Sequence, residues 1–237
     1  MLRLSLIVLA WLIPLRTLTS AEPESPKHLA DLQKLVKALE HTSTKYEHGA
    51  GSIEWGDRPN ATCDCSSLMI HLWKHTYGST ENDIKAWFVV KRPTARRFHD
   101  AINDGKIPAW KKINKLKDAK PGDLIVMKYT EAKPGDDTGH VMMIEAAPEA
   151  KKEGPTKVEN ATTEWHIKII DSTSSPHGKA DSRYDPATKN TGVGRGVFRI
   201  YTDKDGDVAA YTWSAESDRT LRKPDTHHLV IGRFVKE

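Results

Sequence analysis

Apolar positions in the first half of the chain recur at helical spacing. Between residues 29 and 39 they return every three or four positions, as in a helix with one buried face, and this segment is expected to run on to Gly49. A second apolar run follows Asp64, a preferred N-cap residue, and reaches Gly78. A shorter helix is expected to end at Gly105. The first half of the chain is therefore predicted to be mainly helical.

The pattern changes after residue 120 to short apolar runs bounded by turn residues, which is typical of strands. Two stretches lack periodicity and are expected to be loops, namely 50–63 and an insertion at about 174–196. Helices followed by a run of antiparallel strands define the α+β class. The expected strands are 124–129, 140–147, 164–173, 196–202, 208–213 and 228–236.

The N-terminal segment has the layout of a secretory signal peptide. Arg3 precedes an apolar run from Leu4 to Leu15. Small residues that suit a cleavage site follow and end at Ala21. A membrane anchor is the less favoured alternative, because a spanning helix needs roughly 20 apolar residues. We expect cleavage after Ala21, which leaves 22–237 as one domain. The mature protein is then secreted or periplasmic and has no stable membrane span.

Charge indicates which partners suit the chain. Lys and Arg total 36 and Asp and Glu total 32, which gives a formal net charge of +4 that is spread along the sequence. Without a basic block, this balance does not indicate a nucleic-acid partner. It suits an anionic polymer such as a bacterial cell wall.

The cysteines Cys63 and Cys65 are the only two in the chain. A disulfide between residues two apart is strained, and a zinc site would need further ligands, so we favour free thiols. Cys65 follows the expected N-cap Asp64, and the first turn of a helix favours a thiolate. Cys65 is therefore the candidate nucleophile, whereas Cys63 lies outside the helix.

A cysteine nucleophile needs a histidine base and a polar group to orient that histidine. Among the 11 histidines, His140 opens a strand directly after a glycine-containing loop, and Asp171 lies near the end of the next strand. This placement favours Cys65, His140 and Asp171 as a catalytic set. The alternative is a buried cysteine and a strand-edge histidine without a joint role.

Four segments in the same order resemble the NlpC family of cell-wall cysteine peptidases. "WGDRPNATCDCSSL" resembles the family's nucleophile motif, and "LKDAKPGDLIVM" resembles its Pro-Gly-Asp-Leu strand. "TGHVMMIEA" resembles the strand with the catalytic histidine, and "IIDST" falls where the family has its third polar residue. The resemblance covers roughly Tyr46 to Thr173. At Ile53 the family commonly has a tyrosine, and the insertion has no family counterpart.

The resemblance implies a papain-like core, in which N-terminal helices pack on an antiparallel sheet. It implies an exported peptidase that cleaves peptidoglycan stem peptides, or another peptide substrate, without a metal or cofactor. Alternatives are an amidase or acyl transferase on wall or lipid amides with the same triad, or an inactive wall-binding module. The implied catalytic residues are Cys65, His140 and Asp171, and the implied substrate-binding residues are Asp64, Ser66 and Trp55.

Overall fold

The computed structural model describes most of the chain after the expected signal peptide. The predicted signal segment, 1–21, lies outside the described residues. Within the part that the structure describes, no helix is both long and apolar enough to cross a membrane. The described ranges are 25–49, 51–133, 135–151, 158–216 and 221–235.

Helices form where the apolar periodicity predicts them, with one correction and one addition. The helix that follows Asp64 begins and ends as predicted, because Asp64 accepts a hydrogen bond from the Ser67 N–H and Gly78 ends the helix at φ 65°. The first helix ends at Ala38 and does not reach Gly49, since the chain beyond it pairs with a strand. A helix before residue 89 was not predicted. The helices are α1 (Lys27–Ala38), α2 (Cys65–Tyr77), α3 (Glu81–Phe88) and α4 (Ala95–Asp104).

The strands form two sheets. The six predicted strands are all present, and their ends shift by a few residues. The stretch 50–63, which we expected to be a loop, instead contains the antiparallel pair β2 and β3, because alternate β3 residues are buried. The strands are β1 (Thr44–Lys45), β2 (Gly51–Glu54), β3 (Asn60–Cys63), β4 (Trp110–Ile113), β5 (Leu124–Tyr129), β6 (Gly139–Ile144), β7 (Glu149–Ala150), β8 (Thr163–Thr173), β9 (Gly192–Thr202), β10 (Val208–Thr212) and β11 (His227–Phe234).

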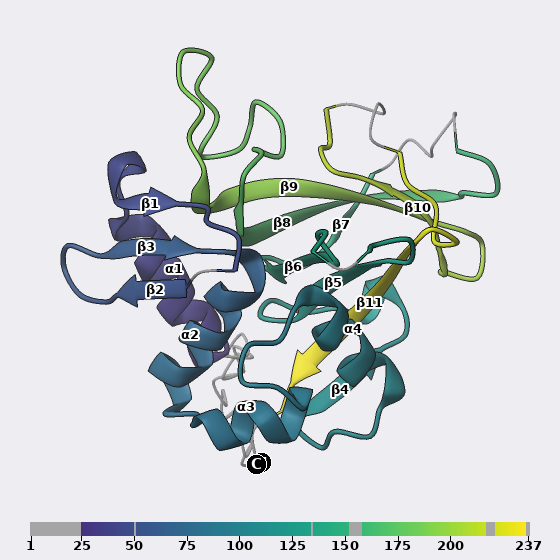
Figure 1. Ribbon diagram of the computed structural model, residues 1–237. Coiled ribbons are helices and arrows are strands. Elements are labelled where there is room, and N and C mark those ends of the chain that lie inside the picture. Colours follow the sequence, from purple (N-terminus) through teal and green to yellow (C-terminus); the bar gives the residue numbers. More distant parts are fainter. Residues whose placement is uncertain (1–24, 50, 134, 152–157, 217–220, 236–237) are drawn as a thin grey trace, which may run out of the picture.

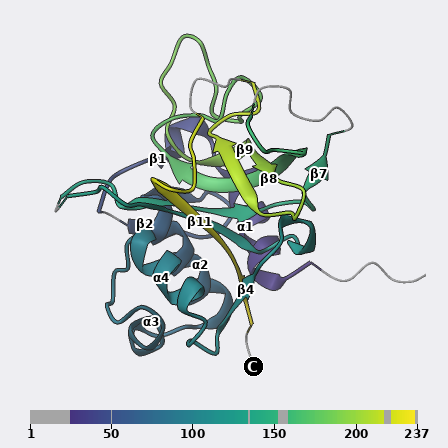
Figure 2. The same ribbon diagram turned by 90° about the vertical axis from the view of Figure 1, so that its right-hand side faces the viewer.

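The large sheet is antiparallel and has helices on one face. Its strand order is β10-β9-β8-β6-β5-β11-β4, with β7 paired to β8, and the small sheet has the order β1-β3-β2. Figure 1 shows α2, α3 and α4 below β8 and β9, and Figure 2 shows the same helices on one side of β11. The molecule is therefore an α+β protein, as predicted.

Both faces of the large sheet are buried. Successive side chains of a strand point to opposite faces, so Val126 packs toward the helices while Ile125 packs on the other side. The second cluster includes Ile113 from one end of the sheet and Tyr211 from the other, so the sheet curls around it.

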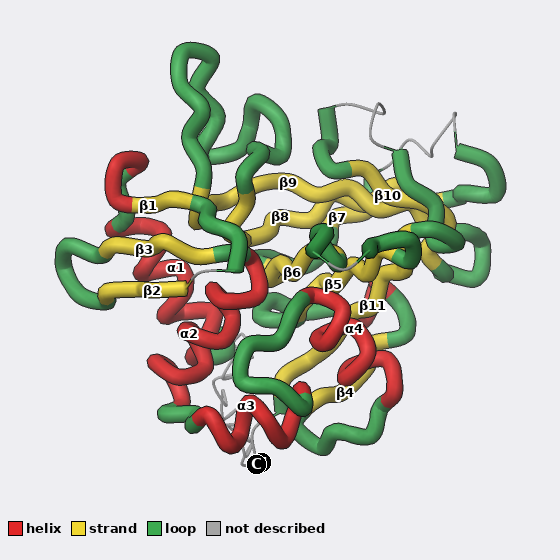
Figure 3. The backbone as a smooth tube through the Cα atoms, viewed as in Figure 1, coloured by secondary structure: helices red, strands yellow, loops and turns green. Residues whose placement is uncertain are grey.

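The loop between β8 and β9 rises from the sheet on the side away from α3 and α4 (Figure 3). It is shorter than the predicted insertion, because β9 already begins at Gly192. Gly194 and Gly196 of β9 make room for this loop. A Cβ atom at Gly194 would lie 2.7 Å from Arg183 Nε, and one at Gly196 would lie 2.8 Å from Asp181 Oδ2.

Candidate active site

Cys65 is the first residue of α2, and its surroundings are built by its immediate neighbours. Asp64 Oδ1 accepts hydrogen bonds from Ser67 N at 2.7 Å and from Ser66 Oγ at 2.9 Å, and Asp64 Oδ2 accepts one from Gly49 N at 3.0 Å. The Cys65 thiol lies within hydrogen-bonding reach of the backbone N–H groups of Val141 and Ser66. The nucleophile candidate therefore lies beside the residue that follows His140.

Burial opposes the effect that the helix N-terminus is expected to have on this thiol. Cys65 is 6% exposed, and burial raises the pKa of its thiol well above the ordinary range, as does the negative charge of Asp64. The N–H groups of Val141 and Ser66 act in the opposite direction but do not outweigh these effects. The helix N-terminus therefore acts against burial and the charge of Asp64, both of which favour the neutral thiol.

His140 on β6 has a carboxylate partner on the neighbouring strand. Its Nε2 lies 2.6 Å from Oδ2 of Asp171, which β8 holds at the end of its pairing with β6. Asp171 has no exposed surface. Because a carboxylate accepts, His140 Nε2 carries the proton, and Nδ1 is left with a lone pair that can take a proton from a thiol. The structure thus brings the predicted base and orienting residues together.

A buried group of charges surrounds Asp171, and the insertion supplies it. We call Asp171, His177, Asp181 and Arg183 the ionic cluster. Arg183 Nη1 lies 2.9 Å from Asp171 Oδ1, as a charge contact rather than a linear hydrogen bond, and Arg183 Nη2 lies 2.7 Å from Asp181 Oδ2. Sequence reasoning did not assign these insertion residues, because no local pattern links them to Asp171.

His177 contacts acceptors through both ring nitrogens. Nδ1 donates to the Trp213 carbonyl at 2.7 Å, and Nε2 lies 2.9 Å from Asp171 Oδ2. Burial raises the pKa of Asp171, but the charges of Arg183 and His177 and the hydrogen bonds from both histidines hold it well below its usual range. With Asp171 ionised, both acceptors require His177 to be an imidazolium. Two carboxylates then face two cations, so the ionic cluster is neutral.

The same side chains form the candidate metal group of the described residues. Donor atoms of His140, Asp171 and His177 all lie within 4.8 Å of one another. His140 Nε2 and His177 Nε2 both already hydrogen-bond to Asp171 Oδ2, and Arg183 supplies positive charge at the carboxylate. A metal ion would have to displace these contacts and lie close to the guanidinium. The arrangement favours a hydrogen-bonded histidine base over a metal centre.

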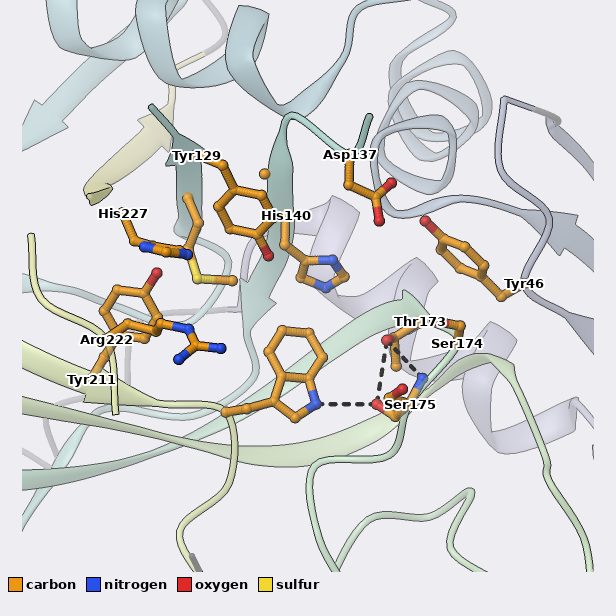
Figure 4. A pocket seen from close by; sticks show the side chains of 13 residues that line it. Tyr46, Tyr129, Asp137, His140, Thr173, Ser174, Ser175, Tyr211, Arg222 and His227 are labelled. Carbon is orange, nitrogen blue, oxygen red and sulfur yellow. Dashed lines mark hydrogen bonds between the residues drawn. The ribbon is translucent and has the colours of Figure 1, made fainter. Parts of the chain in front are cut away.

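Two cavities that share lining residues contain His140 and Cys65, one in each. The histidine-side cavity, of about 320 Å³, is lined by His140, and the cysteine-side cavity, of about 130 Å³, is lined by Cys65. Figure 4 shows the histidine-side cavity, with Tyr46 and Asp137 on one side of His140. Tyr46, Asp137 and Gly139 line both cavities, so the two form one cleft.

The predicted substrate-binding residues separate in the structure. Asp64 and Ser66 line the cysteine-side cavity. Trp55 lines neither cavity, because its ring stacks on His75 with centroids 3.9 Å apart. Tyr46 was not predicted as a site residue. Burial, followed by the nearby Cys65, raises the pKa of its hydroxyl, which marks Tyr46 as a neighbour of the thiol.

Comparison with known proteins places the chain in a family without assigning an activity. The chain is 33% identical over 202 residues to "Uncharacterized protein R653" of Acanthamoeba polyphaga mimivirus. The match covers 81% of this chain and 88% of the viral protein, so the chain belongs to the same family as that protein. No family model and no solved structure matches the chain.

Proposed function

We propose that the protein is an exported cysteine peptidase with a papain-like, NlpC-type core, and that it cleaves peptidoglycan stem peptides. The observation that carries the proposal is the buried pair of His140 and Asp171, at 2.6 Å, next to a cysteine at the first turn of a helix. A cysteine, a base and an orienting carboxylate in this order are the parts that acyl transfer needs.

The mechanism starts from a neutral thiol. His140 Nδ1 takes the proton of Cys65, and the sulfur attacks the carbonyl carbon of the scissile bond. Backbone N–H groups at the start of α2 stabilise the oxyanion, and one such donor lowers the barrier by about 3–4 kcal/mol. His140 returns the proton to the leaving amine, which leaves a thioester. His140 then takes a proton from a water molecule, which attacks the thioester carbon; the C–S bond breaks, the acid leaves, and Cys65 regains its proton from His140.

Asp171 and Tyr46 have supporting roles. Asp171 accepts the Nε2–H of His140, so it fixes the tautomer and stabilises the imidazolium that forms. In the resembled family a tyrosine lines the site near the oxyanion, and here Ile53 takes its sequence position. Tyr46 lines the cleft next to Cys65 and is the side chain that we propose for this role.

The test is a digest of purified peptidoglycan followed by mass spectrometry of the released fragments. We expect new stem-peptide fragments with the wild type and none with Cys65→Ala. Cys63→Ala is the matched control, because Cys63 is also a buried free cysteine but lies outside the helix. Its digest should contain the same fragments, and a chelator should not prevent their release.

Other outcomes point to the alternatives. Fragments that persist with Cys65→Ala would overturn the assigned nucleophile. Loss of fragments on chelation would move the chemistry to His140, Asp171 and His177 as metal ligands. If no fragments form but the protein pellets with the wall, a binding module is the better description. Release of amino sugars or acyl groups in place of peptides would favour the amidase or acyl transferase.

A further inference from the structure

The histidine-side cavity contains a buried polar group without a partner. Tyr211 on β10 is 2% exposed and lines this cavity, and its hydroxyl has no hydrogen-bond partner among the described residues. A buried hydroxyl without a partner is unfavourable relative to one that is paired, because it has lost its hydrogen bonds to water. A ligand oxygen in the cavity would complete the hydroxyl's hydrogen bonding.

The same part of the cavity carries a cation. Arg222 pairs with Tyr211 through two backbone hydrogen bonds, of 3.0 and 2.9 Å. Its side chain lies close enough to Tyr211 and His227 to lower the pKa of both groups, although burial is the larger effect and raises the pKa of Tyr211. Arg222 makes no ion pair with the described residues. In Figure 4 its guanidinium points into the cavity on the side opposite Tyr46.

Arg222 is the one arginine or lysine among the described residues that line this cavity. His227 also lines it, and burial followed by the charge of Arg222 lowers the pKa of His227, which acts against a second positive charge there. Tyr129 and Trp213 supply aromatic walls. One guanidinium with a phenol hydroxyl suits a single carboxylate, whereas a phosphate dianion would need more cationic partners.

The position of the cavity assigns it to the leaving group. The cavity is lined by His140 but not by Cys65, and the cysteine-side cavity is lined by Cys65 but not by His140. In the proposed reaction His140 gives its proton to the departing amine, so that amine and the groups attached to it leave on the side of His140. The acyl half of the substrate stays on the side of Cys65.

We infer that Arg222 and Tyr211 form a subsite for a carboxylate on the leaving group, so that the substrate class is peptides whose leaving amino acid or short peptide carries a free carboxylate. The inference rests on the proposed hydrolase function. It places the carboxylate of the leaving amino acid at Arg222 and its amine at His140. The rest of that amino acid lies against Tyr129 and Trp213.

Binding tests the subsite without requiring turnover. The probe is a stem tetrapeptide in two forms. The acid form has its natural free carboxylates, and in the amide form each carboxylate of the third and fourth residues is converted to an amide. Their affinities for Cys65→Ala are measured by titration calorimetry. We expect the acid form to bind at least about ten-fold more tightly, because a hydrogen bond to a charged group is stronger than a neutral one.

Variants assign the preference to named residues. In the Cys65→Ala background, Arg222→Gln should bring the acid-to-amide affinity ratio close to one, and Tyr211→Phe should reduce it about three-fold. Arg58→Gln, a substitution at an exposed arginine outside both cavities, should keep the full ratio. Circular dichroism checks that each variant is folded. Equal affinity for the two forms, no binding of either form, or a ratio that survives Arg222→Gln overturns the inference.

Turnover by the wild type separates the two proposals. Cleavage of both forms at the same rate, with dependence on Cys65, would keep the hydrolase and remove the carboxylate subsite. A preference for the acid form in binding, without Cys65-dependent cleavage, would remove the hydrolase and the leaving-group role while keeping a carboxylate site.

Discussion

The two sides of the cleft are built in different ways. On the cysteine side, Asp64 caps the helix that begins with Cys65 and binds Ser66 and Ser67, so consecutive residues determine the geometry. On the histidine side, β6, β8 and the β8–β9 loop each contribute, and the contacts are between buried charges. The cysteine side depends on local structure, whereas the histidine side depends on the whole sheet and its insertion.

This difference predicts how the two sides respond to substitution. Changes on the cysteine side should alter turnover and leave the free energy of unfolding nearly unchanged. Changes on the histidine side should alter both, because removal of one member of a buried ionic cluster leaves its partners without compensation. The tests below start with the largest expected effect.

Asp171→Asn should have the largest effect. It leaves His140 without its orienting carboxylate, and loss of the corresponding group in catalytic triads lowers kcat by about 10⁴-fold. It also leaves Arg183 and His177 without their shared anion, so the free energy of unfolding should fall by about 3–5 kcal/mol. Fragment-release kinetics and urea unfolding measure the two effects. Cys65→Ala is the matched variant, with activity lost and stability nearly kept. A stable but inactive Asp171→Asn protein would contradict the comparison.

Arg183→Met tests the ionic cluster without touching the cleft. Arg183 is 1% exposed and contacts both Asp171 and Asp181, so its loss should lower the free energy of unfolding by about 3–5 kcal/mol. Arg195→Met is the control, because the Arg195 side chain is 36% exposed in its ion pair with Glu145, and solvent-exposed pairs contribute about 0–1 kcal/mol. Equal losses for the two variants, measured by urea unfolding, would show that the cluster has no special role.

Acid stability gives a smaller and independent measure of the same cluster. The pKa of Asp171 in the folded protein lies below its unfolded value of about 3.9. Its contribution to stability is therefore present above about pH 4 and is lost as pH falls through the folded pKa. Arg183→Met raises that folded pKa, so its acid-unfolding midpoint should lie at higher pH than that of the wild type. Unchanged midpoints, followed by circular dichroism, would contradict this assignment.

Features that depend on local structure could be predicted from the sequence, whereas features that depend on the whole fold could not. The α2 boundaries were predicted correctly because an N-cap aspartate and a C-terminal glycine act within a few residues. Six strands of the large sheet were found from their apolar runs, whereas β4 and β7 were not predicted. The hairpin of β2 and β3 was missed because each strand has only four residues and depends on burial against the rest of the fold.

The candidate site was predictable where a side chain belongs to a regular element. Cys65, His140 and Asp171 lie at the starts or ends of elements that periodicity finds, and the structure brings His140 and Asp171 into contact. His177 and Arg183 come from a segment without periodicity, so only the folded chain shows their role. The glycines of "GVGRG" were a usable signal, since residues 194 and 196 are small where Arg183 and Asp181 pack.

The smallest effect concerns the thiol itself. In Cys63→Ala, Cys65 is the only cysteine, and burial together with Asp64 raises the pKa of its thiol. We expect iodoacetamide at pH 7 to modify it about ten-fold more slowly than a free thiol of pKa near 8.5, with a rate that rises with pH and reaches no plateau below pH 9. Mass spectrometry of the modified protein gives the rate. Rapid modification near pH 6 would instead indicate a preformed thiolate and imidazolium, and the cysteine side would then carry charge at rest as the histidine side does.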